Sequence, residues 1–249
     1  MPCQYRSAAD FFIILFSVPR RTSCQFAVSW VTLEAMSQLT AVQMVEHQLR
    51  RRGIRDQRVL NAMLLIPREE FVSPVDRRNA YIDAPIPIGY GQTITQPYMA
   101  ALMAERLELR GTEKVLDVGT GSGYHAAVLG ALARQVISIE RIPELAELAR
   151  ANLRRAGLDS NIVVLTGDGS LGVPEEGPFD AISVAAASPR TPPALLAQLN
   201  DPGILVIPVG GRDDQDLNVV RKENGRITTR FASGCRFVPL VGREGWQED

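Results

Sequence analysis

Val-Leu-Asp-Val-Gly-Thr-Gly-Ser-Gly-Tyr, residues 115–124, is the stretch of this sequence that decides the fold. The apolar residues on either side of Asp117 predict a buried strand, and the alternating glycines predict a tight turn before a helix that begins at Tyr124. Glycine reaches backbone torsions that other residues avoid, and it lets a ligand approach the main chain closely. Because the spacing is G-x-G-x-G, whereas dinucleotide oxidoreductases favour G-x-G-x-x-G, the turn indicates a different ligand.

Downstream of Thr112 the pattern alternates between strands and helices, which is typical of α/β proteins. We expect strands at residues 114–118, 136–140, 161–166, 179–184 and 203–209. We expect helices near residues 124–133, 143–156 and 192–199. The segment Ile162-Val163-Val164-Leu165 is apolar throughout, as expected when helices cover both faces of a parallel sheet. The region from about Asp216 to Leu240 predicts antiparallel strand pairs, with Asn224-Gly225 as a hairpin turn.

The region upstream of the glycine turn is predicted to be helical. Apolar residues recur at helical spacing in residues 39–49, and Gly53 closes that segment. Further helices are expected at about residues 56–66 and 97–109, with a loop rich in Gly and Pro at residues 83–91 between them. The expected fold class is a doubly wound, Rossmann-like α/β domain. Its sheet is mostly parallel, with antiparallel C-terminal strands and a helical N-terminal region.

The composition excludes several classes of protein. The chain has 249 residues, 45% hydrophobic and 22% charged, which is typical of a globular protein. Its 27 basic and 28 acidic residues give a net charge of −1, so a strongly cationic nucleic-acid binder is not expected. The three cysteines, Cys3, Cys24 and Cys235, are too few and too scattered for a disulfide framework. No apolar run reaches the roughly 18 residues of a membrane span. We therefore expect a cytoplasmic protein.

Residues 1–35 differ from the rest in composition. They contain an apolar run at residues 11–18. Two interpretations stay open, a poorly ordered extension and a signal or anchor segment; Asp10 beside the run and the lack of a small-residue cleavage site speak against the second. We expect residues 36–249 to form a single domain. Its two parts are a region that covers the ligands, residues 36–110, and an α/β core with the C-terminal strands, residues 111–249.

Acidic residues stand at the carboxyl ends of three successive expected strands: Asp117, Glu140 and Asp168. Asp117 points into the glycine turn, where it would repel a pyrophosphate but can orient the ammonium group of an amino acid. Glu140 is placed to accept both hydroxyls of a ribose, and Asp168 to accept a hydrogen bond from an adenine amino group. Each carboxylate alone is explained as well by a helix cap. Together they fit S-adenosyl-L-methionine (SAM), and the sequence predicts a SAM-dependent methyltransferase rather than a nicotinamide dehydrogenase.

From about Met36 to Trp246 the sequence also resembles a known family, the protein-L-isoaspartate (D-aspartate) O-methyltransferases. The resemblance rests on the glycine turn and on residues 67–72, 87–89, 92–97, 167–169, 179–182, 207–210 and 236–240. The most specific of these are Gln-Thr-Ile-Thr-Gln-Pro at 92–97 and Phe-Val-Pro-Leu at 237–240. It implies a repair enzyme that methylates the free α-carboxylate of L-isoaspartyl residues and, from the family's name, D-aspartyl residues. We expect a monomer that acts on damaged proteins and peptides, releases S-adenosyl-L-homocysteine (SAH), and has no nucleic-acid or membrane partner.

The resemblance also implies the residues of the site. The family's active-site hydroxyl falls on Thr95, where many relatives have serine. The expected cofactor residues, including those of the glycine turn, are Gln92, Thr93, Ile94, Thr95, Asp117, Gly119, Gly121, Glu140, Arg141, Asp168 and Gly169. The expected substrate residues are Ile88, Val238, Pro239 and Leu240. Val241 and Trp246 fall where some relatives have polar cofactor contacts, so they are left out. No metal site is expected.

The expected chemistry needs no strong base, because a carboxylate with a pKa of about 4 is already ionised at neutral pH. The enzyme must instead align the carboxylate oxygen, the methyl group and the sulfur. Thr95 would hydrogen-bond the acceptor carboxylate, and the apolar residues 86–88 and 238–240 would exclude water. His47 and His125 are not needed, and we expect His125 on a helix surface.

Two other functions stay open. One is a SAM-dependent methyltransferase that acts on a small molecule or a nucleic acid. Enzymes that methylate base nitrogens usually have an Asn/Asp-Pro-Pro-aromatic motif after the fourth strand, and residues 184–189 here read Val-Ala-Ala-Ala-Ser-Pro. The basic run at residues 50–52 is explained by a solvated helix end. The other is a non-catalytic binding module. The absence of Asp117, Glu140 or Thr95 would indicate such a module, but all three residues are present. Cys235 is expected in the core.

Overall fold

The computed structural model describes residues 40–247, all of which belong to one compact unit, Gln38–Asp249. The expected N-terminal extension, residues 1–35, lies outside the described residues, and so does Leu39 at the start of the first expected helix. Within residues 40–247, no helix has both the length and the apolar character that crossing a membrane requires.

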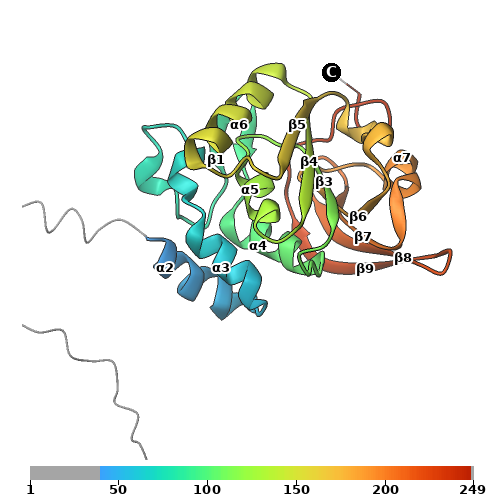
Figure 1. Cartoon of the computed structure of the whole chain (residues 1–249), viewed down its shortest axis with the longest axis horizontal. Coiled ribbons are helices and arrows are strands. Elements are labelled where there is room, and N and C mark those ends of the chain that lie inside the picture. The colour runs from blue at the N-terminus through green and yellow to red at the C-terminus, as the bar shows by residue number, and fades with distance from the viewer. Residues whose placement is uncertain (1–39, 248–249) are drawn as a thin grey trace, which may run out of the picture. The chain divides into compact units, whose positions relative to one another are not determined.

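The centre of this unit is a seven-stranded sheet with the strand order β5-β4-β3-β6-β7-β8-β9 (Figure 1). Its strands are β3 (Lys114–Val118), β4 (Gln135–Glu140), β5 (Ile162–Thr166), β6 (Phe179–Val184), β7 (Leu199–Gly210), β8 (Gln215–Glu223) and β9 (Arg226–Cys235). β3 to β7 pair in parallel, and β8 and β9 are added by antiparallel pairing. This arrangement confirms the doubly wound fold. The chain runs outward from β3 to β5 and then returns to the other side of β3 with β6, so the strand order reverses there.

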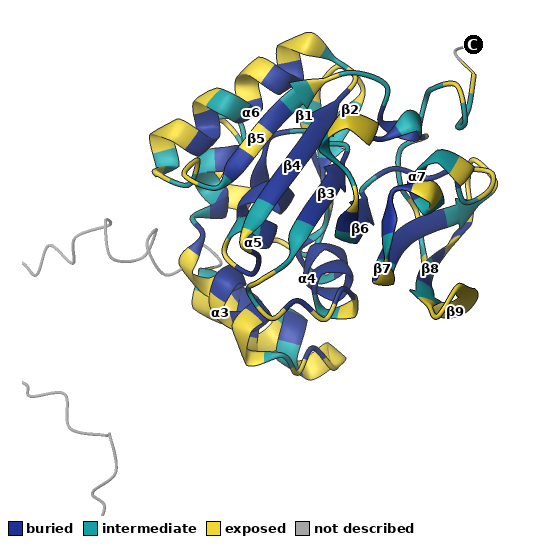
Figure 2. Ribbon diagram, turned by 45° about the vertical axis from the view of Figure 1, so that its right-hand side comes forward, coloured by how far each residue is buried: buried dark blue, intermediate teal, exposed yellow. Residues whose placement is uncertain are grey.

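Helices cover both faces of the sheet. Neighbouring residues of a strand point to opposite sides, so each buried strand contributes apolar side chains to a core on either face. In β3, Val115 belongs to one buried cluster with residues of α3, α4, α5 and α6, whereas Leu116 belongs to another that includes Leu195 of α7. These helices are α3 (Gln57–Leu65), α4 (Pro97–Arg106), α5 (Tyr124–Gly130), α6 (Pro143–Ala156) and α7 (Pro193–Ala197). β3 and β4 are buried almost throughout (Figure 2). Each fully buried Val or Leu in them contributes about 1.5–3 kcal/mol.

The N-terminal region is helical, as expected, but its first segment is not one α-helix. The elements are α2 (Ala41–Gln43), the π-helical turn η1 (Met44–Leu49) and the 3-10 turn η2 (Arg50–Arg52). A capping box between Thr40 and Gln43 starts the segment, and Gly53 ends it in the left-handed conformation, with φ of 100°. Met44 and Leu49 are both fully buried, because the wider π turn brings residues five apart to one side.

Several predicted boundaries differ from the observed ones. α4 ends at Arg106 rather than near Leu109, since Glu108 takes the left-handed conformation with φ of 54°. α5 ends at Gly130, three residues early. α7 is also shorter than expected, because β7 begins at Leu199, where it pairs with Phe179 of β6, and not at Gly203.

A hairpin lies where a loop was expected. Its strands are β1 (Ile86–Gly89) and β2 (Gln92–Ile94). Tyr90 and Gly91 form the turn, with φ of 53° and 70°, and Ile86 and Ile94 face each other as buried partners. The prolines and glycines of this segment obscure the alternation of a strand. The hairpin leads directly into Thr95, so it positions that residue.

The C-terminal hairpin is confirmed, and the environment of Cys235 is not. Asn224 and Gly225 form the turn between β8 and β9, with φ of 53° and 75°. Cys235, expected in the core, is only half-buried at the end of β9, and partial burial raises the pKa of its thiol to about 11. The remaining short elements are the 3-10 turns η3 (Arg68–Phe71), η4 (Arg77–Asn79), η5 (Gly169–Leu171) and η6 (Pro174–Glu176).

Candidate active site

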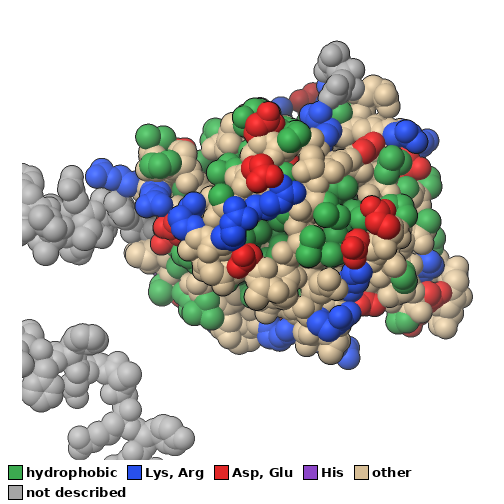
Figure 3. Space-filling view, turned by 45° about the horizontal axis from the view of Figure 1, so that its top comes forward, with side chains coloured by type: hydrophobic (Ala, Val, Ile, Leu, Met, Phe, Trp, Pro, Cys, Tyr) green, Lys and Arg blue, Asp and Glu red, His purple; other side chains and the backbone are tan. Residues whose placement is uncertain are grey.

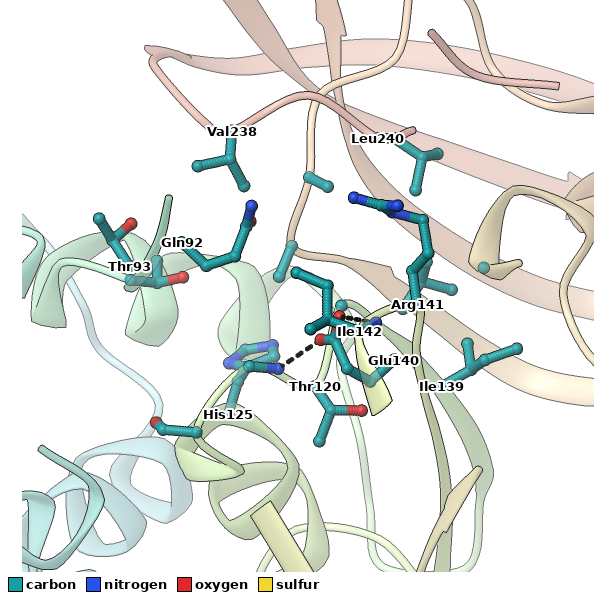
Figure 4. Close-up of a pocket in the computed structure, with 18 of the residues that line it drawn as sticks. Gln92, Thr93, Thr120, His125, Ile139, Glu140, Arg141, Ile142, Val238 and Leu240 are labelled. Atoms are coloured by element: carbon teal, nitrogen blue, oxygen red, sulfur yellow. Dashed lines mark hydrogen bonds between the residues drawn. The ribbon is translucent and has the colours of Figure 1, made fainter. Parts of the chain in front are cut away.

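A cavity lies at the carboxyl ends of β3, β4 and β6, where the strand order reverses. The glycine turn forms one wall, β2 and Thr95 form another, and residues 238–241 lie above them (Figure 4). The residues that line the cavity are Gln92, Thr93, Ile94, Thr95, Val118, Gly119, Thr120, Gly121, Ser122, Tyr124, His125, Ile139, Glu140, Arg141, Ile142, Gly169, Ala185, Ala186, Val238, Pro239, Leu240 and Val241.

The Glu140 carboxylate fixes the glycine turn from the neighbouring strand. Its Oε2 accepts a hydrogen bond from the Gly121 N–H at 2.9 Å, and its Oε1 accepts one from the Ile142 N–H at 3.0 Å. The turn needs glycine, because Gly121 has φ of 54° and a Cβ there would stand 3.2 Å from Ile88 Cδ1. A buried carboxylate with lone pairs to spare thus lies at the cavity wall, where it can accept ribose hydroxyls.

Asp117 lies beneath the glycine turn and does not line the cavity. Its Oδ2 accepts a hydrogen bond from Ser138 Oγ at 2.8 Å, and Ser138 Oγ is 2.6 Å from Thr120 Oγ1. Its Oδ1 has no hydrogen-bond partner among the described residues. Burial raises the pKa of Asp117 to about 7; the Ser138 bond opposes this shift and the charge of Glu140 adds to it. At neutral pH the carboxyl is therefore close to its midpoint of ionisation.

His125 was expected on a helix surface, and that prediction is wrong. Its exposed fraction is 6%, and its ring lines the cavity. Nε2 is 2.9 Å from Ser183 Oγ on β6, and Nδ1 has no hydrogen-bond partner within residues 40–247. Burial lowers the pKa of His125 to about 4, so the ring is neutral at neutral pH.

The Asp168 carboxylate binds the C-terminal turn instead of facing the cavity. Its Oδ1 accepts hydrogen bonds from Ser170 N (2.9 Å) and Oγ (2.6 Å), and its Oδ2 accepts one from Arg243 N at 2.8 Å. Partial burial alone would raise the pKa of this carboxyl, but the bonds from Arg243 and Ser170 keep it below its usual value. The neighbouring Gly169 does line the cavity, and a Cβ there would stand 2.6 Å from Val118 Cγ1.

A larger cleft of about 550 Å³ opens beside the cavity. The residues shared by the two are Thr93, Thr95, Ala185, Val238 and Pro239. Three arginines line the cleft, Arg52, Arg212 and Arg236, and among the described residues that line it there is no Asp or Glu. The Arg52 guanidinium stacks 3.5 Å from the centre of the Tyr98 ring, which also lines the cleft. Arg52 forms an ion pair with Asp83 at 2.5 Å and Arg236 one with Asp213 at 3.1 Å, so part of this positive charge is already neutralised by carboxylates outside the lining.

Most of the predicted site residues meet in one place. Those that line the cavity are Gln92, Thr93, Ile94, Thr95, Gly119, Gly121, Glu140, Arg141, Gly169, Val238, Pro239 and Leu240. Three do not line it: Asp117, Asp168 and Ile88, whose side chain lies over Gly121. His125 and Arg52 also line these two spaces and were not predicted as site residues. For His125, the available signal was its place one residue after the start of the helix that follows the glycine turn.

The fold and the cavity define a Rossmann-like methyltransferase, since a doubly wound sheet places a glycine turn and an acidic strand end around one cavity. Comparison with known proteins then gives the family. The chain belongs to the protein-L-isoaspartate(D-aspartate) O-methyltransferase family, whose model matches residues 40–245.

Individual relatives agree with this assignment. The chain is 55% identical over 208 residues to a protein-L-isoaspartate O-methyltransferase of Koribacter versatilis, which covers 84% of this chain and 93% of the relative. A relative of the same name from Methanoculleus marisnigri is 54% identical over 205 residues, and the match covers 82% of this chain and 93% of the relative. Among solved structures, a Plasmodium falciparum protein named for this activity, in complex with SAH, matches with a TM-score of 0.71 and 30% identity. That match covers 82% of this chain and 99% of the other.

Proposed function

We propose that this protein transfers the methyl group of SAM to the free α-carboxylate of L-isoaspartyl residues in damaged proteins and peptides. The observation that supports this most directly is that the candidate cofactor cavity and the candidate substrate cleft meet at Thr95. A methyltransferase needs its cofactor and its acceptor to be in contact at one point, with a polar group there to orient the acceptor.

The cavity residues fit SAM. Glu140 offers a carboxylate to the ribose, and the glycines leave the backbone open where a Cβ at Gly121 or Gly169 would meet Ile88 or Val118. Two buried polar atoms, Asp117 Oδ1 and His125 Nδ1, have no partner among the described residues and lie in or beneath the cavity wall. When bound, SAM supplies an electrophilic methyl group.

The residues of the chain then align the acceptor and exclude water. The Thr95 hydroxyl donates a hydrogen bond to the acceptor carboxylate, and the apolar side chains of Val238, Pro239 and Leu240 keep water from the point of contact. Because charge is lost as carboxylate and sulfonium react, a water-poor site favours the step. No general base is required, which agrees with a His125 whose pKa is lowered to about 4. The backbone nitrogen of the following residue of the peptide then attacks the ester carbonyl and methanol leaves, which gives a succinimide. Part of the succinimide hydrolyses to normal aspartate.

An alternative function is methyl transfer to a small molecule or a nucleic acid. The residues directly after β6 provide little for such an acceptor to bind, because Ala185 and Ala186 line the cavity there without a polar side chain. The net charge is −1, and Figure 3 shows basic, acidic and hydrophobic side chains interspersed over the face that it presents. A phosphate backbone binds best to a continuous basic surface. These features favour a peptide acceptor.

The test uses the purified full chain, radiolabelled SAM and two peptides that differ only in Asp or isoAsp at one position. We expect base-labile methyl incorporation into the isoAsp peptide alone, because esters of carboxylates are cleaved by mild base. Labelling of both peptides equally, or of neither while SAH still binds, would contradict the proposed acceptor. In the second case the small-molecule and nucleic-acid alternatives would be tested next.

We infer further that the protein acts as a monomer in the cytoplasm, on proteins and not on nucleic acid or membrane. The three cysteines of the sequence suit a reducing compartment. Light scattering on the active protein measures its mass, and a stable dimer whose dissociation abolishes activity would contradict this inference.

A further inference from the structure

His125 presents an unpaired polar atom in the wall of the cavity. The side chain begins on the first turn of α5, directly after the glycine turn, and 94% of its surface is buried, since its exposed fraction is 6%. Nε2 is fixed by Ser183 Oγ at 2.9 Å, and Nδ1 has no partner among residues 40–247. In Figure 4 the ring lies between the hairpin residues Gln92 and Thr93 and the glycine turn.

An unpaired buried ring nitrogen is costly. A buried donor or acceptor that lacks a partner costs about 1–3 kcal/mol, and an apolar side chain at this position would avoid that cost. Such groups are rare in folded proteins, and a ligand that completes the hydrogen bond accounts for them. The position of Nδ1 in a cavity wall therefore points to a bound group.

The neighbouring polar residues indicate which end of the cofactor that group belongs to. Ser138, Asp117 and Ser183 are direct partners in the register of β4, β3 and β6, so they form one polar row beneath the glycine turn. His125 extends this row through Ser183, and Asp117 Oδ1 is its other unpaired atom. Glu140, the residue suited to the ribose, binds the turn from the opposite side, at the end of β4.

We propose that His125 is a binding residue for the α-amino acid group of the cofactor, which it contacts through Nδ1. This inference rests on the proposed function, because it needs SAM or SAH in the cavity. A neutral imidazole has one donor and one acceptor nitrogen. The hydrogen bond between Nε2 and Ser183 decides whether Nδ1 is the donor or the acceptor. An α-amino acid group complements either form, since it contains both a carboxylate acceptor and an ammonium donor.

The test compares two ligands that differ by that group. SAH contains the amino acid portion, and 5′-methylthioadenosine has the same nucleoside and sulfur without it. His125→Leu should raise the Kd for SAH about 10–100-fold, the range that corresponds to a charge-assisted hydrogen bond. The same substitution should change the Kd for methylthioadenosine less than threefold. His125→Gln, which restores a polar atom, should recover most of the SAH affinity. His47→Leu is the matched control, because His47 is exposed on η1 and should change neither Kd.

A measurement on the unmodified chain removes any dependence on how the variants fold. The chain has two histidines, so ¹⁵N-histidine labelling gives two ring systems, and His47→Leu assigns them. Addition of SAH should shift the Nδ1 resonance of His125, and methylthioadenosine should leave it nearly unchanged. Equal losses of affinity for both ligands in His125→Leu, or no Nδ1 shift with SAH, would overturn the inference. If SAH fails to bind the unmodified protein, the proposed function itself fails, and the two failures are thus distinguishable.

Discussion

Asp117 is a fully buried carboxyl group beneath the glycine turn, and its ionisation destabilises the folded state. Its folded-state pKa of about 7 lies above the ordinary value of 3.8. Between these two pH values the folded protein binds more protons than the unfolded chain, so stability falls as pH rises. The contribution of Asp117 is complete below about pH 4 and is lost as pH rises through 7. The buried carboxylate is retained at this cost, which is consistent with a role toward a cationic ligand group.

Asp117→Asn tests this trade-off. Relative to the unmodified protein, the free energy of unfolding of the ligand-free variant should be higher by about 2 kcal/mol at pH 5 and by about 4 kcal/mol at pH 8, because the amide does not ionise. Its SAH affinity should fall at the same time. Urea unfolding at the two pH values and calorimetry measure these effects. Asp159→Asn, at an exposed position, is the control and should change neither quantity. An identical pH dependence of unfolding in Asp117→Asn and the unmodified protein would contradict the raised pKa.

Thr95 is the residue on which the chemical proposal depends. Thr95→Val keeps the shape and removes the hydroxyl, so kcat should fall about 10–100-fold, which corresponds to a charge-assisted hydrogen bond of about 1.5–3 kcal/mol. The Kd for SAH should stay within threefold, since the glycine turn and Glu140 are unchanged. Thr95→Ser retains the hydroxyl and should keep most of the activity. Steady-state kinetics with an isoAsp peptide measure this, and full activity in Thr95→Val would remove the hydroxyl from the mechanism.

At the scale of elements, Arg68 links three segments around Thr95. The side chain is fully buried; its Nε donates to Ala80 O at 2.7 Å and its Nη2 donates to Thr95 O at 2.8 Å. Its guanidinium lies 4.6 Å from the centre of the Tyr124 ring at the start of α5. One planar group thus fixes the turn η3 to three other segments: the end of η4, the residue after β2 and the helix after the glycine turn.

Arg68→Met should therefore affect folding and activity together. The substitution leaves the carbonyl groups of Ala80 and Thr95 without their donor, at about 1–3 kcal/mol each, so the free energy of unfolding should fall by about 2–6 kcal/mol. The kcat should also fall, because Thr95 loses its backbone anchor. Arg58 also donates to two carbonyl groups, Leu109 O and Leu132 O, but at an exposed position away from the cavity. Arg58→Met is the control and should leave kcat unchanged; equal kcat values for both variants would contradict a positioning role for Arg68.

The C-terminal turn is a second element whose packing affects the site. Gly242 lies against the Asp168 carboxylate so closely that a Cβ there would stand 2.0 Å from Oδ1. Gly242→Ala must push the turn away from Asp168 and from the Ser170 hydroxyl, which accepts from Glu244 N. We expect weaker SAH binding, measured by calorimetry, because Val241 in this turn lines the cavity. Gly211→Ala is the matched control, since a Cβ there meets only Asp214 O at 3.9 Å.

Some features of these elements can be predicted from the sequence, and others depend on contacts between distant segments. The glycine turn and the parallel strands follow from local torsional needs and from short-range periodicity, and they were predicted correctly. The burial of His125 depends on Ser183, which is 58 residues away on β6, so helical position alone placed it wrongly. The same holds for Asp168, whose Oδ2 accepts a hydrogen bond from Arg243 N, 75 residues later in the chain. Contacts between distant segments, and the neighbours that they give to a side chain, are not encoded in the spacing of the motif.

At the scale of the whole molecule, we propose that residues 36–249 form a single methyltransferase domain. Every residue that lines the cavity or the cleft lies between Arg52 and Val241, and the family model matches residues 40–245. Deletion of residues 1–35 should therefore leave kcat/KM for an isoAsp peptide within twofold and Tm within about 2 °C, the shift that a change below 1 kcal/mol gives at this size.

Both quantities are needed, because they separate two roles of the deleted segment. A lower Tm with unchanged kcat/KM would show that residues 1–35 contribute to folding, and would contradict the domain boundary. A lower kcat/KM at unchanged Tm would show that they reach the ligands. Deletion of residues 1–52 is the positive control, since it also removes Met44 and Leu49 from the core and Arg52 from the cleft. Loss of Met44 and Leu49 alone should cost about 4–10 kcal/mol, at 2–5 kcal/mol for each large buried side chain, so this longer deletion should unfold the protein.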